Sequence, residues 1–160
     1  EAKKAIYHCC RIAKEKNIQI ALSLSDLFCV ERHRKDFLSL ISEFIDIVFA
    51  NEAELKSLYQ MDFSSCINKL KEVITIGAIT LGSKGSLIFK NGLEYNINAN
   101  KIENLVDTTG AGDLFAAGFL YGFSKSLSLD NCGFLGTKAA SEIITYYGAR
   151  PKISLKNLLS

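Results

Sequence analysis

The sequence predicts an α/β fold of three layers, α/β/α, in which helices cover both faces of a mostly parallel β-sheet that also carries a β-hairpin. Segments with strand character alternate with segments with helical character, as a parallel sheet requires. The pair Asn91-Gly92 stands between two short apolar stretches and is a strong signal for a hairpin turn. With 160 residues, 48% of them hydrophobic, the chain can bury the core of one domain.

Helix and strand signals follow one another along the first half of the chain. Apolar residues recur at helical spacing within 5–13 and predict a helix over 2–16. Residues 18–24 alternate and then run apolar, as a buried strand does. The elements expected next are a helix over 31–42, a strand over 45–50, and helices over 52–59 and 67–72.

The second half continues the alternation and places three polar loops after strands. The expected elements are a strand over 73–81, a turn at 82–85, hairpin strands over 86–90 and 93–97, a strand over 102–106, and helices over 111–123 and 130–147, the last ended by Gly148 and Pro151. Ligands of such sheets bind beyond the carboxyl ends of the strands. Because Asn51, the 80–85 loop and Asp107 each follow a predicted strand, we expect them to meet at one edge.

Composition and charge narrow the class of protein. A net charge of +2 is too small to favour nucleic-acid or membrane partners, and no apolar run is long enough to span a bilayer. Five cysteines, an odd number without a Cys-x-x-Cys pair, indicate reduced thiols and a cytoplasmic protein. The two histidines lie in polar helical stretches, so a Cys/His metal site is not expected.

The segment 107–113, Asp-Thr-Thr-Gly-Ala-Gly-Asp, is the most informative part of the chain because an apolar helix pattern follows it at once. A helix that begins after such a turn presents unpaired N–H groups and a partial positive charge to an anion. The backbone N–H groups of Gly110, Ala111 and Gly112 would form this anion hole. Asp113 would then remove the proton from a hydroxyl that attacks phosphorus. The alternative is an aspartate that only caps the helix after a glycine turn.

Two further segments agree with this motif in order and spacing. The heptad 107–113 resembles the C-terminal signature of the ribokinase-like (PfkB) carbohydrate and nucleoside kinases. Asn51-Glu52-Ala53-Glu54 resembles the Asn-x-x-Glu motif of that family, and 80–85 resembles its Thr-x-Gly-x-x-Gly loop. The closing residues 148–151 also resemble the family. By general similarity, the sequence is closest to the adenosine-kinase-like branch.

The resemblance implies a set of roles in binding ATP and Mg²⁺. The nucleotide would contact Asn51, Thr137 and the loop that consists of Thr80, Leu81, Gly82, Ser83, Lys84 and Gly85. Asn51 and Glu54 would orient Mg²⁺ through its water shell, which suits an ion that keeps its waters. From the residues alone, the favoured interpretation of Asn51 is a helix cap completed by Glu54, and the alternative for 80–85 is a plain hairpin turn.

The resemblance also implies a monovalent cation, K⁺ in particular, next to the anion hole at Asp107 and Thr109. Lys152 stands where the family often has a small hydroxyl residue. One hypothesis is that its ammonium group partly replaces the ion. The alternative is a solvated lysine near the end of the sequence.

The functional expectation is an ATP-dependent phosphotransferase that acts on an alcohol hydroxyl of a nucleoside, adenosine foremost, or of a sugar. Because Glu1 begins inside a helix pattern, we expect residues 1–160 to be the C-terminal nucleotide-binding and catalytic portion of a kinase. The acceptor-binding N-terminal portion, and the lid through which the full-length protein could form a homodimer, would be absent. The alternative is a nucleotide-binding module that is catalytically silent in this form. A dinucleotide-binding oxidoreductase is disfavoured because the Gly-x-Gly-x-x-Gly fingerprint is missing.

Overall fold

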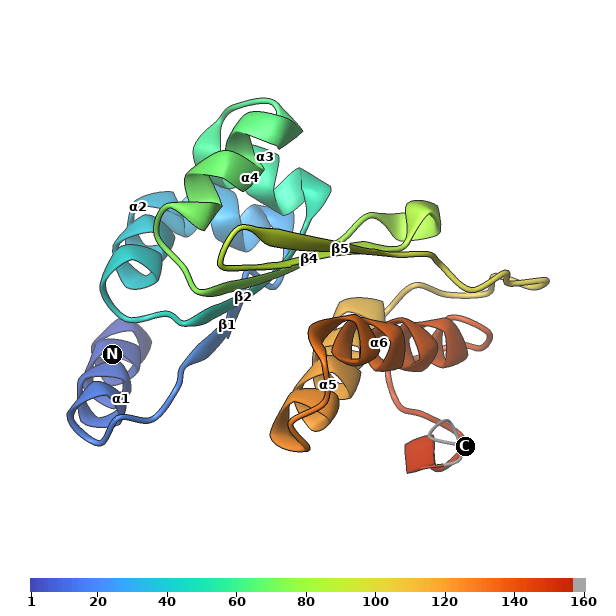
Figure 1. Cartoon of the computed structure of the whole chain (residues 1–160). Coiled ribbons are helices and arrows are strands. Elements are labelled where there is room, and N and C mark those ends of the chain that lie inside the picture. Colours follow the sequence, from blue (N-terminus) through green and yellow to red (C-terminus); the bar gives the residue numbers. More distant parts are fainter. Residues whose placement is uncertain (157–160) are drawn as a thin grey trace. The chain divides into compact units, whose positions relative to one another are not determined.

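A computed structural model describes residues 1–156 and shows an α/β fold (Figure 1). Its elements are, in chain order, α1 (Ala2–Glu15), β1 (Ala21–Ser23), α2 (Leu27–Glu43), β2 (Ile47–Asn51), α3 (Glu52–Tyr59), α4 (Phe63–Lys71), β3 (Ile76–Thr80), the 3₁₀ turn η1 (Gly82–Lys84), β4 (Ser86–Lys90), β5 (Leu93–Ile97), α5 (Ala111–Ser124) and α6 (Leu129–Ile143). The chain divides into two compact units, one of residues 1–78 and 89–93 and one of residues 79–88 and 94 onward.

The five strands form one sheet in the order β1-β2-β3-β4-β5. β1 and β2 are parallel, with Ala21 opposite Ile47, and helices α3 and α4 connect β2 to β3 in the manner of a parallel crossover. β3, β4 and β5 are joined by short loops, which makes them an antiparallel meander. Asn91 and Gly92 both have positive φ, so the predicted hairpin turn is confirmed.

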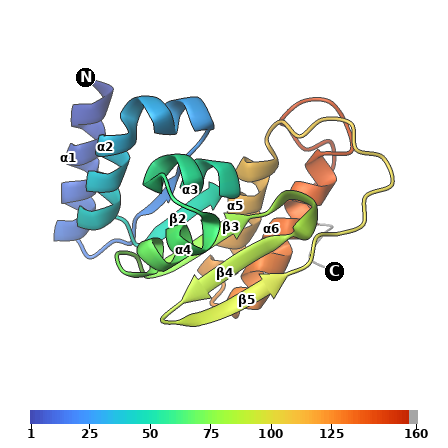
Figure 2. The ribbon, with the colours of Figure 1, turned by 90° about the horizontal axis from the view of Figure 1, so that it is seen from above.

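The first unit packs its helices around the apolar strand β2, in which four of five residues are buried. Two helices begin earlier than expected because an aspartate caps each of them. Asp26 Oδ1 accepts a hydrogen bond from Cys29 N at 2.8 Å and starts α2 at Leu27, and Asp62 caps α4 in the same way. Helix α1 lies beside α2 (Figure 2), and the rings of Tyr7 and Phe44 meet edge to face.

The second unit is built on an antiparallel helical hairpin of α5 and α6. A Cβ atom on Gly118 would lie 2.5 Å from the backbone oxygen of Leu135, so the two helices approach at backbone distance. Helix α6 lies equally close to β4 and β5, because a Cβ on Gly133 would lie within 3.0 Å of Ile88 and Ile97 side chains. This packing fixes the start of α5 relative to the loop that follows β3.

Two sequence predictions in this unit are wrong. The expected strand over 102–106 is irregular and largely exposed, because the N–H groups of Val106 and Asp107 donate to Ile144 O instead of to a strand. The helix expected over 130–147 ends at Ile143, since the Ile144 carbonyl is taken by these two donors. The α/β class and the hairpin are confirmed, and the five-stranded sheet is mixed rather than mostly parallel, because β3, β4 and β5 form an antiparallel meander. Across residues 1–156, no helix is both long and apolar enough to cross a membrane.

Candidate active site

The loop before α5 has the geometry of an anion site. Gly110 occupies the N-cap position with φ of 81°, in the left-handed region, and no side chain caps the helix. Ala111 N donates to Thr108 O at 3.1 Å, so this N–H closes the turn, while Leu114 N begins the helical pattern by donating to Gly110 O. Gly112 and Asp113 follow in the exposed first turn, at the positive end of the helix dipole.

Contacts from the segment after α6 hold this loop in place. Asp107 Oδ2 accepts a hydrogen bond from Gly148 N at 3.0 Å, and Oδ1 accepts two from Thr109, at 2.9 Å from N and 2.7 Å from Oγ1. Gly110 lies against Ala149, where a Cβ at position 110 would be 2.8 Å from the Ala149 Cβ. The Gly148 N–H, followed by the Thr109 donors, lowers the pKa of the Asp107 carboxyl below its usual 3.8.

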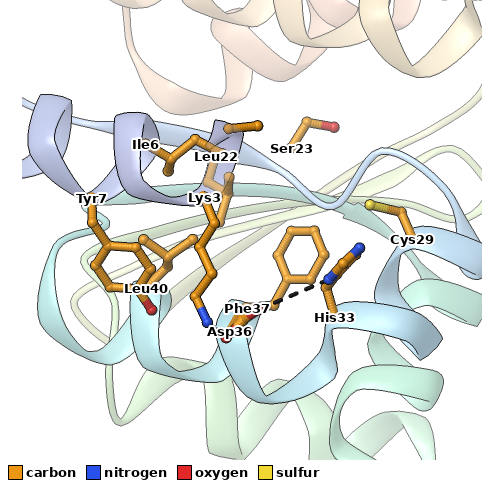
Figure 3. A pocket seen from close by; sticks show the side chains of 11 residues that line it. Lys3, Ile6, Tyr7, Leu22, Ser23, Cys29, His33, Asp36, Phe37 and Leu40 are labelled. Atoms are coloured by element: carbon orange, nitrogen blue, oxygen red, sulfur yellow. Dashed lines mark hydrogen bonds and ion pairs between the residues drawn. The ribbon is translucent and has the colours of Figure 1, made fainter.

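A cavity of about 330 Å³ in the first unit is lined by none of the predicted site residues (Figure 3). α1, β1 and α2 line it with mostly apolar side chains, and Phe37 projects into it. At one end, Asp36 pairs with Lys3 and lies 3.9 Å from His33 Nδ1. Asp36 therefore already has a cationic partner, Lys3, within the unit.

The second unit holds a larger cavity of about 620 Å³, and five of the eight predicted nucleotide-contacting residues line it: Thr80, Gly82, Ser83, Gly85 and Thr137. The loop after β3, the irregular segment before α5, the start of α5 and one face of α6 form its walls. Its lining consists of Thr80, Gly82, Ser83, Gly85, Ala99, Asn100, Lys101, Ile102, Leu105, Thr108, Ala111, Gly112, Phe115, Thr137, Ala140, Ser141 and Ile144. Two loops distant in sequence thus share one cavity with Thr137, which is 6% exposed.

Some predicted residues of this unit lie outside the lining, and some lining residues were not predicted. Leu81, Lys84, Gly110 and Asp113 are absent from the walls, as are Asp107 and Thr109. The unpredicted part is chiefly the 99–105 segment, which carries no turn or helix signal in the sequence. The α6 wall was open to prediction, because small residues recur there at helical spacing: Thr137, Ala140 and Ser141.

Asn51 and Glu54 lie in the first unit and form a complete capping box at the start of α3. Asn51 Oδ1 accepts from Glu54 N at 2.8 Å. Glu54 accepts from Asn51 N at 2.9 Å and from Asn51 Nδ2 at 2.8 Å, so both carboxylate oxygens are engaged. Glu54 is 6% exposed, and burial, with a smaller effect from the Asp26 charge, raises the pKa of its carboxyl.

The capping box leaves the pair able to take part in holding a metal ion. The capping interpretation is confirmed. Each Glu54 oxygen accepts one hydrogen bond from Asn51 and keeps a further lone pair, so the box is compatible with contact to the waters of a Mg²⁺ ion, which retains its waters. Within the part of the chain that the structure describes, no group of three or more His, Cys, Asp or Glu side chains could hold a metal.

Comparison with known proteins assigns the chain to a protein family. The sequence model of a family described as pfkB family carbohydrate kinase matches residues 1–156. The chain belongs to this family. The resemblance inferred from 51–54, 80–85 and 107–113 is thereby confirmed.

Two solved structures of kinases are similar to this chain in fold and sequence. A probable sugar kinase from Rhizobium etli CFN 42 has a TM-score of 0.95 and 46% sequence identity, over 99% of this chain and 48% of that one. The adenosine kinase of Sinorhizobium meliloti has a TM-score of 0.96 and 41% identity, over 99% and 49%. An uncharacterized sugar kinase of Archaeoglobus fulgidus is 40% identical over 105 residues, which are 65% of this chain and 42% of that protein. This pfkB-family chain spans about half the length of these relatives.

Proposed function

We propose that this chain carries the nucleotide-binding and catalytic portion of an ATP-dependent kinase that phosphorylates an alcohol hydroxyl. The observation that carries the proposal is the cavity shared by the 80–85 loop, the start of α5 and Thr137. Its volume of about 620 Å³ suits a nucleotide-sized ligand. Among the described lining residues only Lys101 is charged, so a flat, neutral base would meet mostly apolar and hydroxyl groups.

The transferred phosphoryl group would lie at the N-terminus of α5. There the N–H groups of Gly110 and Gly112 and the helix dipole would stabilise the charge on its oxygens, with Ala111 contributing the turn that aims them. The Asp113 carboxylate would accept the proton of the acceptor hydroxyl while the hydroxyl oxygen bonds to the γ-phosphorus and the bond to ADP breaks. A general base of this kind contributes roughly 100- to 10,000-fold in rate.

Mg²⁺ would be held through water by Asn51 and Glu54, and it would neutralise charge on the β- and γ-phosphate oxygens. The roles of Asn51 and Glu54 are compatible with their capping box, because the box fixes the side chains that waters would contact. We propose Asp107 and Thr109 as the place of a monovalent cation. Three N–H and O–H donors already surround that carboxylate, so we expect only a weak response to K⁺.

The proposed acceptor is a nucleoside, with adenosine favoured over a sugar. Support comes from the 41% identity to an adenosine kinase, while the 46% identity to a probable sugar kinase keeps sugars in the test. All five cysteines are free thiols, in keeping with the proposed cytoplasmic location. A homodimer of the full-length protein remains a prediction.

The experiment that tests this function measures ATP-dependent phosphorylation of a panel of nucleosides and sugars by the full-length protein. Asp113→Asn should lower kcat by at least about 100-fold. Asp130→Asn is the matched control, because Asp130 also lies exposed in the first turn of a helix of the same unit. We expect that control to retain wild-type turnover.

Two results would contradict the proposal in different ways. Equal activity of Asp113→Asn and the wild type would remove Asp113 from the reaction. Binding of ATP without turnover of any acceptor would favour the alternative, a nucleotide-binding module that is silent in phosphoryl transfer. Replacing K⁺ by tetramethylammonium in the same assay tests the cation site, where a large loss of rate would contradict the weak response we expect.

A further inference from the structure

The segment that follows α6, residues 144–152, wraps against the anion loop as a strap. Its first residue, Ile144, accepts hydrogen bonds from Val106 N at 2.9 Å and Asp107 N at 3.4 Å. Further along, Gly148 N donates to the Asp107 carboxylate. Ala149 abuts the backbone of Gly110. The strap therefore contacts the loop before, within and at the end of its turn.

The strap is closed on itself by one tyrosine and one lysine. Lys152 N donates to the hydroxyl of Tyr146 at 2.9 Å, and the ammonium nitrogen of Lys152 lies 4.7 Å from the centroid of the same ring. The backbone of Lys152 thus contacts the hydroxyl of Tyr146, and the side chain of Lys152 contacts the ring of Tyr146. Together they hold 146–152 as a compact turn, with Gly148 and Ala149 in its middle.

Tyr146 is also the anchor of the strap on the helical hairpin. It packs against a core cluster of Leu114, Ala139 and Ile143, against which Ala111 and Leu155 also pack. Leu114 is the residue after Asp113, and Ala111 is the first residue of the helix. Tyr146 thus joins the core cluster that includes the first turn of α5 to the clamp that orients Gly148 and Ala149.

We propose that Tyr146 and Lys152 are positioning residues, which clamp the strap so that Gly148 and Ala149 hold the anion loop and the first turn of α5 in working geometry. Only the expected effect on kcat rests on the proposed phosphoryl transfer; the clamping of the loop does not. Neither side chain needs to touch substrate. They act through the loop, whose N–H groups and Asp113 must be placed accurately, because an error of about 1 Å can lower a rate roughly 100-fold.

The variants separate the two contacts. Lys152→Met keeps the backbone donor and the aliphatic stem but removes the cation from the ring, whereas Lys152→Arg keeps a cation that stacks on tyrosine. Tyr146→Phe removes the accepting hydroxyl and keeps the ring. In the full-length protein we expect Lys152→Met and Tyr146→Phe to lower kcat about tenfold with nearly unchanged KM for the acceptor. Lys152→Arg should restore kcat to within about twofold of wild type.

A second measurement does not depend on activity. Hydrogen exchange of the amides of Val106, Asp107 and Thr109 reports the loop directly, because each donates a hydrogen bond in the braced structure. We expect these amides to exchange about tenfold faster in Lys152→Met than in wild type, without a matching change at the buried centre of α6.

The matched control is Lys125→Met. Lys125 lies over the Tyr121 ring at 5.9 Å, at the opposite end of α5, so its removal deletes a similar contact far along the helix from the loop. That control should change neither kcat nor exchange at 106–109. Unchanged loop exchange in Lys152→Met, or acceleration spread evenly over α5 and α6, would overturn the proposal. Inactivity of the wild type would defeat the proposed function, yet the exchange measurement would still decide the role of the strap.

Discussion

Gly110 and Ala149 approach so closely that a Cβ atom at position 110 would lie 2.8 Å from the Cβ and 3.0 Å from the Cα of Ala149. Gly110 has φ of 81°, where side chains other than hydrogen are disfavoured. Steric space and backbone angle therefore both require glycine at the residue that starts α5.

We expect Gly110→Ala to destabilise the protein and to impair phosphoryl transfer. Gly92→Ala separates the two causes, because Gly92 also has φ of 81° but no atom within 4 Å of its would-be Cβ. Gly92→Ala should lower the free energy of unfolding by about 1 kcal/mol through strain alone. Gly110→Ala should cost more, measured by urea unfolding, and should lower kcat, whereas Gly92→Ala should not. Equal destabilisation by the two would show that the contact with Ala149 is not tight.

Gly112→Ala should have opposite effects on stability and binding. A Cβ at Gly112 meets nothing within 4 Å, and alanine inside an exposed helical turn is favoured over glycine by about 0.5–1 kcal/mol. The free energy of unfolding should therefore stay equal or rise. Since Gly112 lines the cavity, the added methyl group should weaken ATP binding, which calorimetric titration measures. Unaltered ATP affinity would place the nucleotide away from this turn.

Asn51→Ala distinguishes capping from metal binding. Loss of the cap should lower the free energy of unfolding by about 1 kcal/mol. Asp62→Ala removes the corresponding cap of α4, where the aspartate accepts from Ser65 N, and should cost a similar amount. If Asn51 also orients Mg²⁺, only Asn51→Ala should raise the Mg²⁺ concentration needed for half-maximal rate. Indistinguishable Mg²⁺ titrations of the two variants would leave Asn51 as a cap alone.

Glu54 should make stability depend on pH. Burial raises the pKa of its carboxyl above the ordinary 4.5 in the folded protein, so the folded state binds this proton more tightly than the unfolded state does. The protonated Glu54 carboxyl therefore contributes its whole stabilisation below pH 4.5. This contribution is lost as the pH rises through the raised pKa of the folded state. The free energy of unfolding of wild type relative to Glu54→Gln should therefore fall across that window in urea titrations.

Asp62 is a control for which the dependence of stability on pH should have the opposite sign. Its hydrogen bonds with Ser65 lower the pKa of the Asp62 carboxyl below 3.8. Its contribution is therefore present above 3.8 and is lost as pH falls through the lowered value. A Glu54→Gln difference that followed the Asp62→Asn pattern instead would contradict the burial of Glu54.

Local patterns in the sequence were sufficient for much of the fold. The helix over 52–59 and the hairpin strands over 86–90 and 93–97 have the predicted bounds, because their caps and the Asn91-Gly92 turn act over a few residues. The 102–106 segment failed since its apolar residues resemble a strand, whereas its hydrogen-bond partner, Ile144, is far away in sequence. A partner of that kind leaves no mark in the local pattern.

The cavity residues also divide into those that a local sequence pattern predicts and those that it does not. Motif residues that line the cavity, such as Thr80 and Gly112, were predicted because glycine turns and helix starts carry their own signal, whereas the role of Asp113 stays a prediction. The cavity walls contributed by Asn100 and Leu105 could not, since irregular backbone has no period. The Tyr146–Lys152 clamp was also beyond the sequence, which showed only a lysine in an unusual place.

The helical hairpin has a consequence for how the loop is assembled during synthesis. α5 and α6 are consecutive and nearly equal in length, so their pairing brings Asp107 and Gly148 together although 41 residues separate them. Contacts between sequence neighbours form early, and once the hairpin exists this long closure loses little further chain entropy. A nascent chain halted before residue 148 would already display Asp113, yet the turn before its helix would lack the contacts that Gly148 and Ala149 make.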